Sequence, residues 1–162
     1  ERANLMKNKI RFSTIGDLSR LPTSVVKEVE KTVSATENCS GMELVFALSY
    51  GGRQEITDAV RAIASSVKNG SLDLEQISES LVSHSLQCNM DVDLMIRTSG
   101  ECRLSGFLPW QSTYAELYFT QTLWPYFSVD ELWRAFEFYS SRQRRFGKTS
   151  SQVEASLTQS QL

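Results

Sequence analysis

Short apolar runs alternate along the chain with longer stretches in which apolar residues recur every three or four positions. The short runs are typical of buried strands, and the first three of them end at turns that contain glycine or serine. The longer stretches have the spacing of one face of a helix. Strands are therefore predicted at residues 10–15, 43–48, 92–96 and 116–120.

Helices are predicted between and after these strands, and several carry a start signal. Pro22 stands where one helix begins, and the pairs Asp73–Gln76 and Ser128–Glu131 have the spacing of capping boxes. The apolar positions that share one face of each predicted helix are, in chain order, Val25, Val26, Val29 and Val33; Ile56, Val60, Ile63 and Val67; Leu74, Ile77 and Leu81; and Leu132, Phe136 and Tyr139.

This alternation predicts an α/β fold with a mainly parallel sheet flanked by helices. In open parallel sheets, ligands bind beyond the carboxyl ends of the strands. Asp17, the turn Gly51–Gly52–Arg53 and Arg97 all follow predicted strands directly, which favours a binding site there. The domain is expected to span residues 1–147, and the polar segment 148–162 to be a flexible tail.

Composition narrows the class of protein. The chain of 162 residues is 41% hydrophobic and 22% charged, as in a soluble globular domain. A net charge of −2 argues against a nucleic-acid partner. The odd number of cysteines, without a C-x-x-C pair, disfavours disulfides and structural zinc and favours a reducing cytosol. A single His excludes a His-rich metal site, and no apolar run approaches the ~20 residues that span a bilayer.

The loop after the third predicted strand holds the clearest candidate chemistry. Arg97 and Arg103 flank a glycine-containing turn, and Ser105 follows them. Guanidinium groups bind phosphate oxygens through paired N–H donors, so this loop is suited to a diphosphate. Two ordinary surface arginines fit the spacing equally well. Cys102 has no neighbouring His to activate it, which favours an inert thiol over a nucleophile.

Other candidates are weaker. Glu116, in an apolar stretch, requires a metal or an arginine as partner, unless it faces water at a strand edge. The turn at 50–53 either presents amides to an anion or simply joins a strand to a helix. The basic cluster at 142–147 is either solvated or lends charge to an anion site. The large aromatic residues expected in the core are Trp110, Phe119, Trp124, Phe127, Trp133 and Phe136.

Several blocks resemble the cis-prenyltransferases, and the undecaprenyl diphosphate synthases in particular. The longest is D-L-M-I-R-T-S-G-E-C-R-L-S-G-F-L-P-W-Q and its continuation to residue 127, followed by R-Q-R-R-F-G at 142–147. Residues 15–22 and 46–63 resemble two upstream blocks in the right order. The resemblance implies extension of an allylic diphosphate, such as farnesyl diphosphate, with isopentenyl diphosphate in a cis condensation that uses Mg²⁺. It also implies a cytoplasmic homodimer that associates peripherally with a membrane through its product.

The resemblance assigns roles to individual residues. The positions matching those that bind isopentenyl diphosphate are Arg97, Arg103, Leu104 and Ser105. Glu116 matches the C-terminal Mg²⁺ ligand. Arg145 and Gly147 match the terminal R-x-G, which in the family reaches across a dimer interface toward the same phosphates.

The sequence also departs from the family pattern. Ser49 replaces the first residue of N-Y-G-G-R, and Gly106 replaces the last of R-L-S-N. The blocks D-G-N-x-R-W and F-S-x-E-N-W do not occur, so no catalytic residue is assigned in this chain. We expect it to be the C-terminal two-thirds of such an enzyme, carrying the isopentenyl-diphosphate half of the site. The alternative is a non-catalytic partner or fragment that dimerises with a catalytic chain; a nucleotide-binding domain lacks its G-x-G-x-x-G.

Residues 1–162 alone are predicted to dimerise without transferring prenyl groups. The family's essential Asp and allylic-diphosphate loop have no counterpart here, whereas the aromatic C-terminal region has apolar surface to bury. Incorporation of radiolabelled isopentenyl diphosphate, measured beside light scattering, tests both expectations. Turnover well above background would contradict the first, and a soluble monomer the second.

Overall fold

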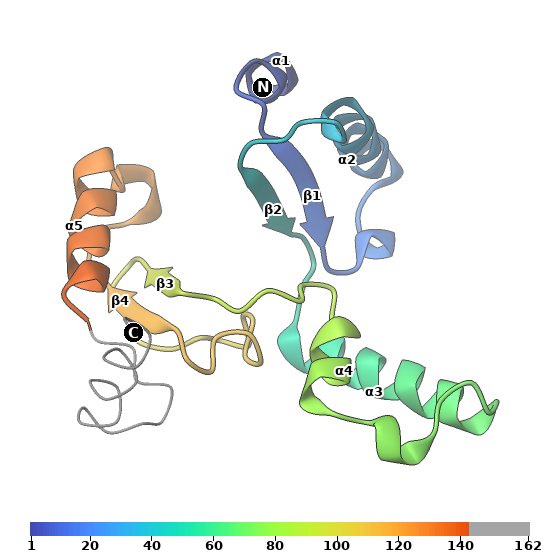
Figure 1. Cartoon of the computed structure of the whole chain (residues 1–162). Helices are drawn as coiled ribbons and strands as arrows, with labels where there is room; N and C mark the ends of the chain where they lie inside the picture. Colours follow the sequence, from blue (N-terminus) through green and yellow to red (C-terminus); the bar gives the residue numbers. More distant parts are fainter. Residues whose placement is uncertain (143–162) are drawn as a thin grey trace, which may run out of the picture. The chain divides into compact units, whose positions relative to one another are not determined.

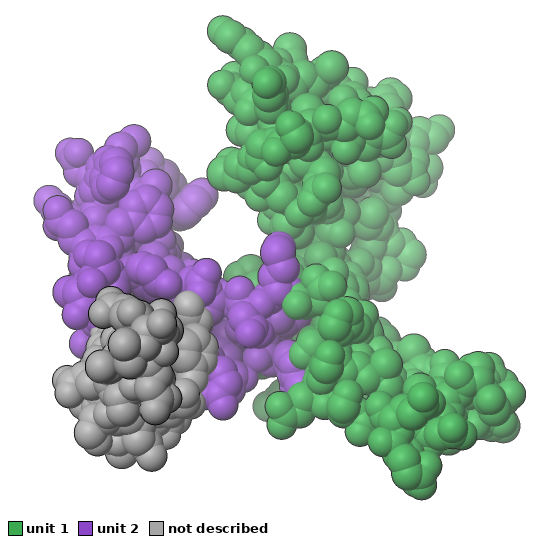
Figure 2. All heavy atoms as spheres, in the orientation of Figure 1, with its two compact units in different colours: residues 1–89, 106–109 green, residues 90–105, 110–162 purple. Residues whose placement is uncertain are grey.

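The computed structural model describes residues 1–142 (Figure 1). These form two compact units, each described by itself: unit 1 comprises residues 1–89 and 106–109, and unit 2 comprises residues 90–105 and the described chain from 110 (Figure 2). The elements are, in chain order, α1 (Arg2–Lys7), β1 (Arg11–Ile15), η1 (Leu18–Arg20), α2 (Thr23–Thr36), β2 (Glu43–Ala47), α3 (Gly52–Lys68), η2 (Leu74–Gln76), α4 (Glu79–His84), β3 (Leu94–Arg97), β4 (Glu116–Phe119), η3 (Trp124–Tyr126) and α5 (Val129–Ser140).

Unit 1 is built around the parallel pair β1–β2, which runs in register from Arg11 opposite Glu43 to Ile15 opposite Ala47. Helix α2 packs beside β1 (Figure 1). Thr36, at the end of α2, is fully buried, and its hydroxyl accepts a hydrogen bond from the Phe12 amide at 3.0 Å. The strands predicted at 10–15 and 43–48 and the helix after Pro22 are therefore confirmed.

Helix α3 is also confirmed, with Ala59 and Ile63 buried on its inner face. The capping box at Asp73 exists, but it closes only the single turn η2. The prediction of one helix through Leu74, Ile77 and Leu81 is wrong, because Ile77 is extended and Ser78 supplies a new N-cap for α4. Two competing caps five residues apart divide the segment.

Unit 2 contains the second parallel pair, in which β3 and β4 align from Leu94 opposite Glu116 to Arg97 opposite Phe119. Helix α5 packs against β4, where Tyr118 meets Phe138 with ring centroids 5.4 Å apart. The Ser128 hydroxyl caps α5 by accepting from the Glu131 amide, which confirms the predicted helix start but only one half of the predicted capping box. Both described strand pairs are parallel and helix-flanked, which confirms the α/β class.

The expectation that six large aromatic residues belong to the core is wrong for four of them. Trp124 and Trp133 are 72% and 61% exposed, and Phe119 and Phe136 are also exposed. A two-stranded sheet covers only one side of a helix, and α5 buries Ala135 there. Within residues 1–142, no helix combines the length and apolar character required to cross a bilayer.

The close approach of α3 to residues 106–109 yields a stability prediction. A Cβ at Gly52 would lie 2.1 Å from Cδ of Pro109 and 2.7 Å from the Gly106 carbonyl oxygen, whereas a Cβ at Gly51 meets nothing within 4 Å. Gly52→Ala is expected to destabilise the chain by about 1–3 kcal/mol or more, because overpacking forces the backbone apart. Gly51→Ser is the control, since serine suits an N-cap. Equal midpoints of urea denaturation for the two variants would contradict the contact.

Candidate functional site

The arginine loop continues directly from β3 and is anchored by its backbone. The carbonyl of Arg97 accepts from the Thr120 amide at 3.0 Å, so the strand pairing extends one step past β4. Ser99 and Gly100 follow in the left-handed region, with φ of 68° and 70°. Their amides donate to the carbonyls of Thr122 and Thr120, both at 2.9 Å. The loop is therefore docked on the turn at 120–122.

Arg97 lies half-buried on the wall of an open cavity of about 650 Å³. Among the described residues, its guanidinium takes part in no ion pair. Two segments of the chain line the cavity: residues 96–99 with Glu101, and Trp124, Phe127, Ser128, Val129 and Leu132. A half-buried cation without a carboxylate partner is suited to bind an anion.

Arg103 is placed differently from Arg97. It forms an ion pair with Glu101, its side chain is 65% exposed, and it does not line the cavity. Ser105 is exposed with φ of 50°, and Leu104 is half-buried; neither lines the cavity. The structure thus brings Arg97 to a cavity and leaves the other predicted substrate-binding residues of the loop outside it.

Glu116 begins β4 and forms an ion pair with Arg142, whose Nε lies 3.1 Å from the carboxylate. Of the partners considered for this residue, the structure provides the arginine, and the Glu116 side chain is 19% exposed. The ion pair therefore favours the partnered interpretation over a carboxylate that only faces water. Glu116 pairs with Leu94, three residues before Arg97, which separates them by ~10 Å along the strands. The alternation of side chains also assigns them to opposite faces of the pair.

A magnesium site in this part of the chain would depend on Glu116. No group of three or more His, Cys, Asp or Glu side chains that could hold a metal occurs among residues 1–142. Mg²⁺ typically takes one or two carboxylates and completes its shell with substrate phosphates and water. A single partly buried carboxylate fits that requirement when a diphosphate is present.

The turn at 50–53 lies next to a buried carboxylate of the chain itself. Glu55, in the first turn of α3, is 3% exposed and accepts from the Tyr50 hydroxyl at 2.6 Å and the Gln87 amide at 2.9 Å. Burial, and then the hydrogen bond to Glu55, raise the pKa of Tyr50 above its usual range. A negative charge already occupies this helix start, so the structural interpretation of the turn is favoured over an anion site.

Asp17 meets this turn, as the strand-end argument predicted. Both line a cavity of about 540 Å³ together with Arg20, Gln54 and Asp58. Three carboxylates, those of Asp17, Glu55 and Asp58, border it beside one arginine. This lining is too acidic for a diphosphate, which leaves the arginine loop as the candidate.

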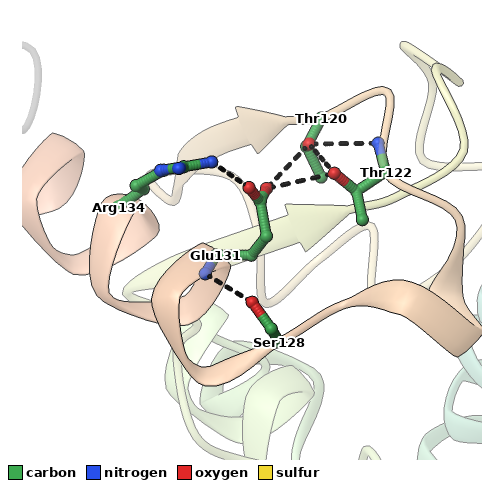
Figure 3. A network of polar contacts seen from close by, with 5 residues as sticks. All are labelled: Thr120, Thr122, Ser128, Glu131 and Arg134. Atoms are coloured by element: carbon green, nitrogen blue, oxygen red, sulfur yellow. Dashed lines mark hydrogen bonds and ion pairs between the residues drawn. The ribbon is translucent and has the colours of Figure 1, made fainter.

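One residue near the loop was identified in the sequence only as a helix cap. The Glu131 carboxylate turns away from Ser128 and bonds to Thr120 and Thr122 (Figure 3). Two hydroxyl residues with T-x-T spacing after a strand are the sequence signal for such a contact. Arg145 and Gly147 lie outside the described residues.

Comparisons with known families agree on one relationship. A family model with the description "Putative undecaprenyl diphosphate synthase" matches residues 1–147. An isoprenyl transferase of Porphyromonas gingivalis is 51% identical over 155 residues, which are 94% of this chain and 61% of that protein. A ditrans,polycis-undecaprenyl-diphosphate synthase of Francisella tularensis, specific for (2E,6E)-farnesyl diphosphate, is 46% identical over 92% of this chain and 58% of its own length.

Solved structures show the same similarity. Lavandulyl diphosphate synthase from Lavandula x intermedia, in complex with dimethylallyl diphosphate, superposes with a TM-score of 0.88 at 36% identity, over 91% of this chain and 64% of that one. A "probable undecaprenyl diphosphate synthase" from Campylobacter jejuni gives a TM-score of 0.80, also at 36% identity, over 91% and 67%. The chain spans about three-fifths of the length of the curated relatives it matches.

Proposed function

This chain belongs to the undecaprenyl diphosphate synthase family of prenyltransferases, and we propose that it carries the isopentenyl-diphosphate half of a cis-prenyltransferase site. The reaction is the condensation of isopentenyl diphosphate with an allylic diphosphate such as farnesyl diphosphate. A new carbon–carbon bond forms at the allylic carbon, pyrophosphate leaves that carbon, and a proton leaves the isopentenyl unit to give a cis double bond.

The observation that carries the proposal is that Arg97 is half-buried beside a cavity and forms no ion pair with any residue in the described range 1–142. Its backbone is fixed by the hydrogen bonds of the loop, so little ordering is required when an anion binds. Arg103 and Ser105 complete the diphosphate contacts in this proposal. Arg103 must then exchange Glu101 for a phosphate, which its exposed position permits.

Glu116 is the proposed Mg²⁺ ligand. The ion supplies positive charge that stabilises diphosphate oxygens. Glu116 lies apart from Arg97 in unit 2, so the two residues have separate roles in this proposal: Arg97 would bind the diphosphate, and Glu116, which pairs with Arg142 in this structure, would hold the ion.

Exposed aromatic side chains support a homodimer as part of the same proposal. Trp124, Trp133 and Phe136 present apolar surface that unit 2 does not bury. The terminal residues Arg145 and Gly147 are proposed to reach the partner's phosphates. A cytoplasmic location, with peripheral membrane association through the product, completes the proposal.

A non-catalytic partner subunit is the alternative function. A chain that only stabilised a catalytic subunit would not need to retain the arginines and the glutamate of a diphosphate site, yet Arg97 is present with Arg103 and Glu116. The transferase role is therefore favoured, and the substrate kinetics below separate the two.

Arg97→Ala or Arg103→Ala in the full-length gene product is expected to raise the KM for isopentenyl diphosphate tenfold or more. Each lost charge-assisted phosphate contact costs ~1.5–3 kcal/mol. Arg97→Lys should also be impaired, because an ammonium cannot reproduce the planar fork. The control is Arg61→Ala, since that arginine is 70% exposed on α3. Unchanged kinetics in both loop variants would refute the assignment.

Glu116→Gln is expected to lower activity and to raise the Mg²⁺ concentration needed for half-maximal rate several-fold, because the amide keeps the shape but not the charge. Arg142→Gln is the matched variant, which breaks the same ion pair but leaves the carboxylate free for the metal. Magnesium titrations of both proteins make the comparison. Equal metal requirements for Glu116→Gln and the unaltered protein would show that the ion pair is the residue's only role.

A further inference from the structure

Glu131 occupies an unusual position for a residue in the first turn of a helix. Its side chain is only 13% exposed, and one carboxylate oxygen accepts from the hydroxyls of both Thr120 and Thr122 at 3.2 Å (Figure 3). The other oxygen pairs with Arg134. Glu131 therefore connects α5 to the turn that follows β4.

These contacts are not those of a helix cap. In a capping box, the glutamate side chain returns to the backbone amide of the N-cap residue. Here Ser128 caps the helix through its own hydroxyl, which accepts from the Glu131 amide at 3.3 Å. The carboxylate is directed to the threonines instead, so its partial burial serves the turn rather than the helix.

The turn at 120–122 is also hydrogen-bonded to the backbone of the arginine loop. The Thr122 amide donates to the Thr120 hydroxyl oxygen at 3.2 Å, which fixes the turn internally. The carbonyls of the same two threonines accept the amides of Gly100 and Ser99. Ser99 is a non-glycine residue in the left-handed region, a conformation that persists only where the surrounding structure holds it.

We propose that Glu131 is a positioning residue for the anion-binding loop. It orients the threonines, the threonines hold the backbone of Ser99 and Gly100, and that backbone fixes the start of the loop that runs from Arg97 to Arg103. Arg134 compensates the carboxylate's charge, so Glu131 does not repel an anion at the loop. The consequence for catalysis rests on the proposed function, whereas the coupling to the loop backbone does not.

The first test measures the coupling without reference to activity. Amide hydrogen exchange of Ser99 and Gly100 is followed by NMR in the full chain and in two variants, Glu131→Ala and Thr122→Val. Both variants are expected to exchange at these amides about tenfold faster or more, because a charge-assisted hydrogen bond is lost. Thr122→Val leaves α5 intact, so it keeps the test valid if Glu131→Ala fails to fold.

Two variants serve as matched controls. Thr122→Ser keeps the hydroxyl and is expected to restore slow exchange, which a simple packing role for the threonine methyl would not predict. Asp130→Ala removes an acidic side chain from the exposed side of the same helical turn and is expected to change nothing at Ser99 and Gly100. Unchanged exchange in Thr122→Val, or no rescue by Thr122→Ser, would overturn the positioning role.

The second test uses isopentenyl diphosphate kinetics in the full-length gene product. Thr122→Val and Glu131→Ala are expected to raise KM several-fold with a smaller change in kcat, since they disturb binding geometry rather than a reacting group. A normal KM in both, while Arg97→Ala raises it, would overturn the positioning role. A normal KM in all three, with faster exchange in the first two, would uphold the coupling and refute the diphosphate assignment of the loop.

Discussion

The docking of residues 97–100 on the turn at 120–122 is the constraint on which unit 2 depends. Strands β3 and β4 are four residues each, so their own ladder is short. The hydrogen bonds beyond the strand ends extend this ladder through Thr120 and Thr122 and carry the chain into two consecutive left-handed residues. Without these hydrogen bonds, Arg97 would lie at a frayed strand end, and the backbone that positions its guanidinium would not be ordered.

The two units treat similar strand ends in opposite ways. In each, a parallel strand ends at a turn that contains glycine, the position where α/β proteins bind ligands. After β2, the buried Glu55 carboxylate lies beside the turn, where it accepts from the Tyr50 hydroxyl and, outside the turn, from the Gln87 amide. After β3, Arg97 is left without a carboxylate partner among the described residues: Glu101 pairs with Arg103, and Glu116 lies on the opposite face of the strand pair. A carboxylate of the protein lies beside the turn after β2, whereas none pairs with Arg97 after β3, so among the described residues the second turn is the better suited to an anion.

Local signals in the sequence were sufficient for most elements. The strands, α3 and the Ser128 cap follow from periodicity and capping, which act over a few residues. The helix predicted from Asp73 failed because Ser78 offers a second cap, and α1 is too short to show a period. The exposure of Trp124 and Trp133 could not be predicted, since apolar spacing does not reveal how much of a helix its neighbours cover.

The sequence names candidate site residues but does not reveal how they are arranged. Arg97 and Glu116 stand in one continuous block of sequence, which suggests a single cluster, yet strand register and pleat assign them to opposite ends and faces of β3–β4. Register depends on pairing between distant segments and is not written in either strand alone.

Helix α5 is long enough to reach both ends of the β3–β4 pair, where Arg97 and Glu116 lie. Twelve residues of helix extend ~18 Å, enough to run the full length of a four-residue strand pair. The first helical turn of α5 carries Glu131, which accepts a hydrogen bond from Thr122 in the 120–122 turn. Just beyond the end of the helix, Arg142 pairs with Glu116. The helix and the residue just past its C-cap therefore place charged side chains of opposite sign at the two ends of β4. The two candidate roles, diphosphate binding and metal binding, are separate in space but share this one support.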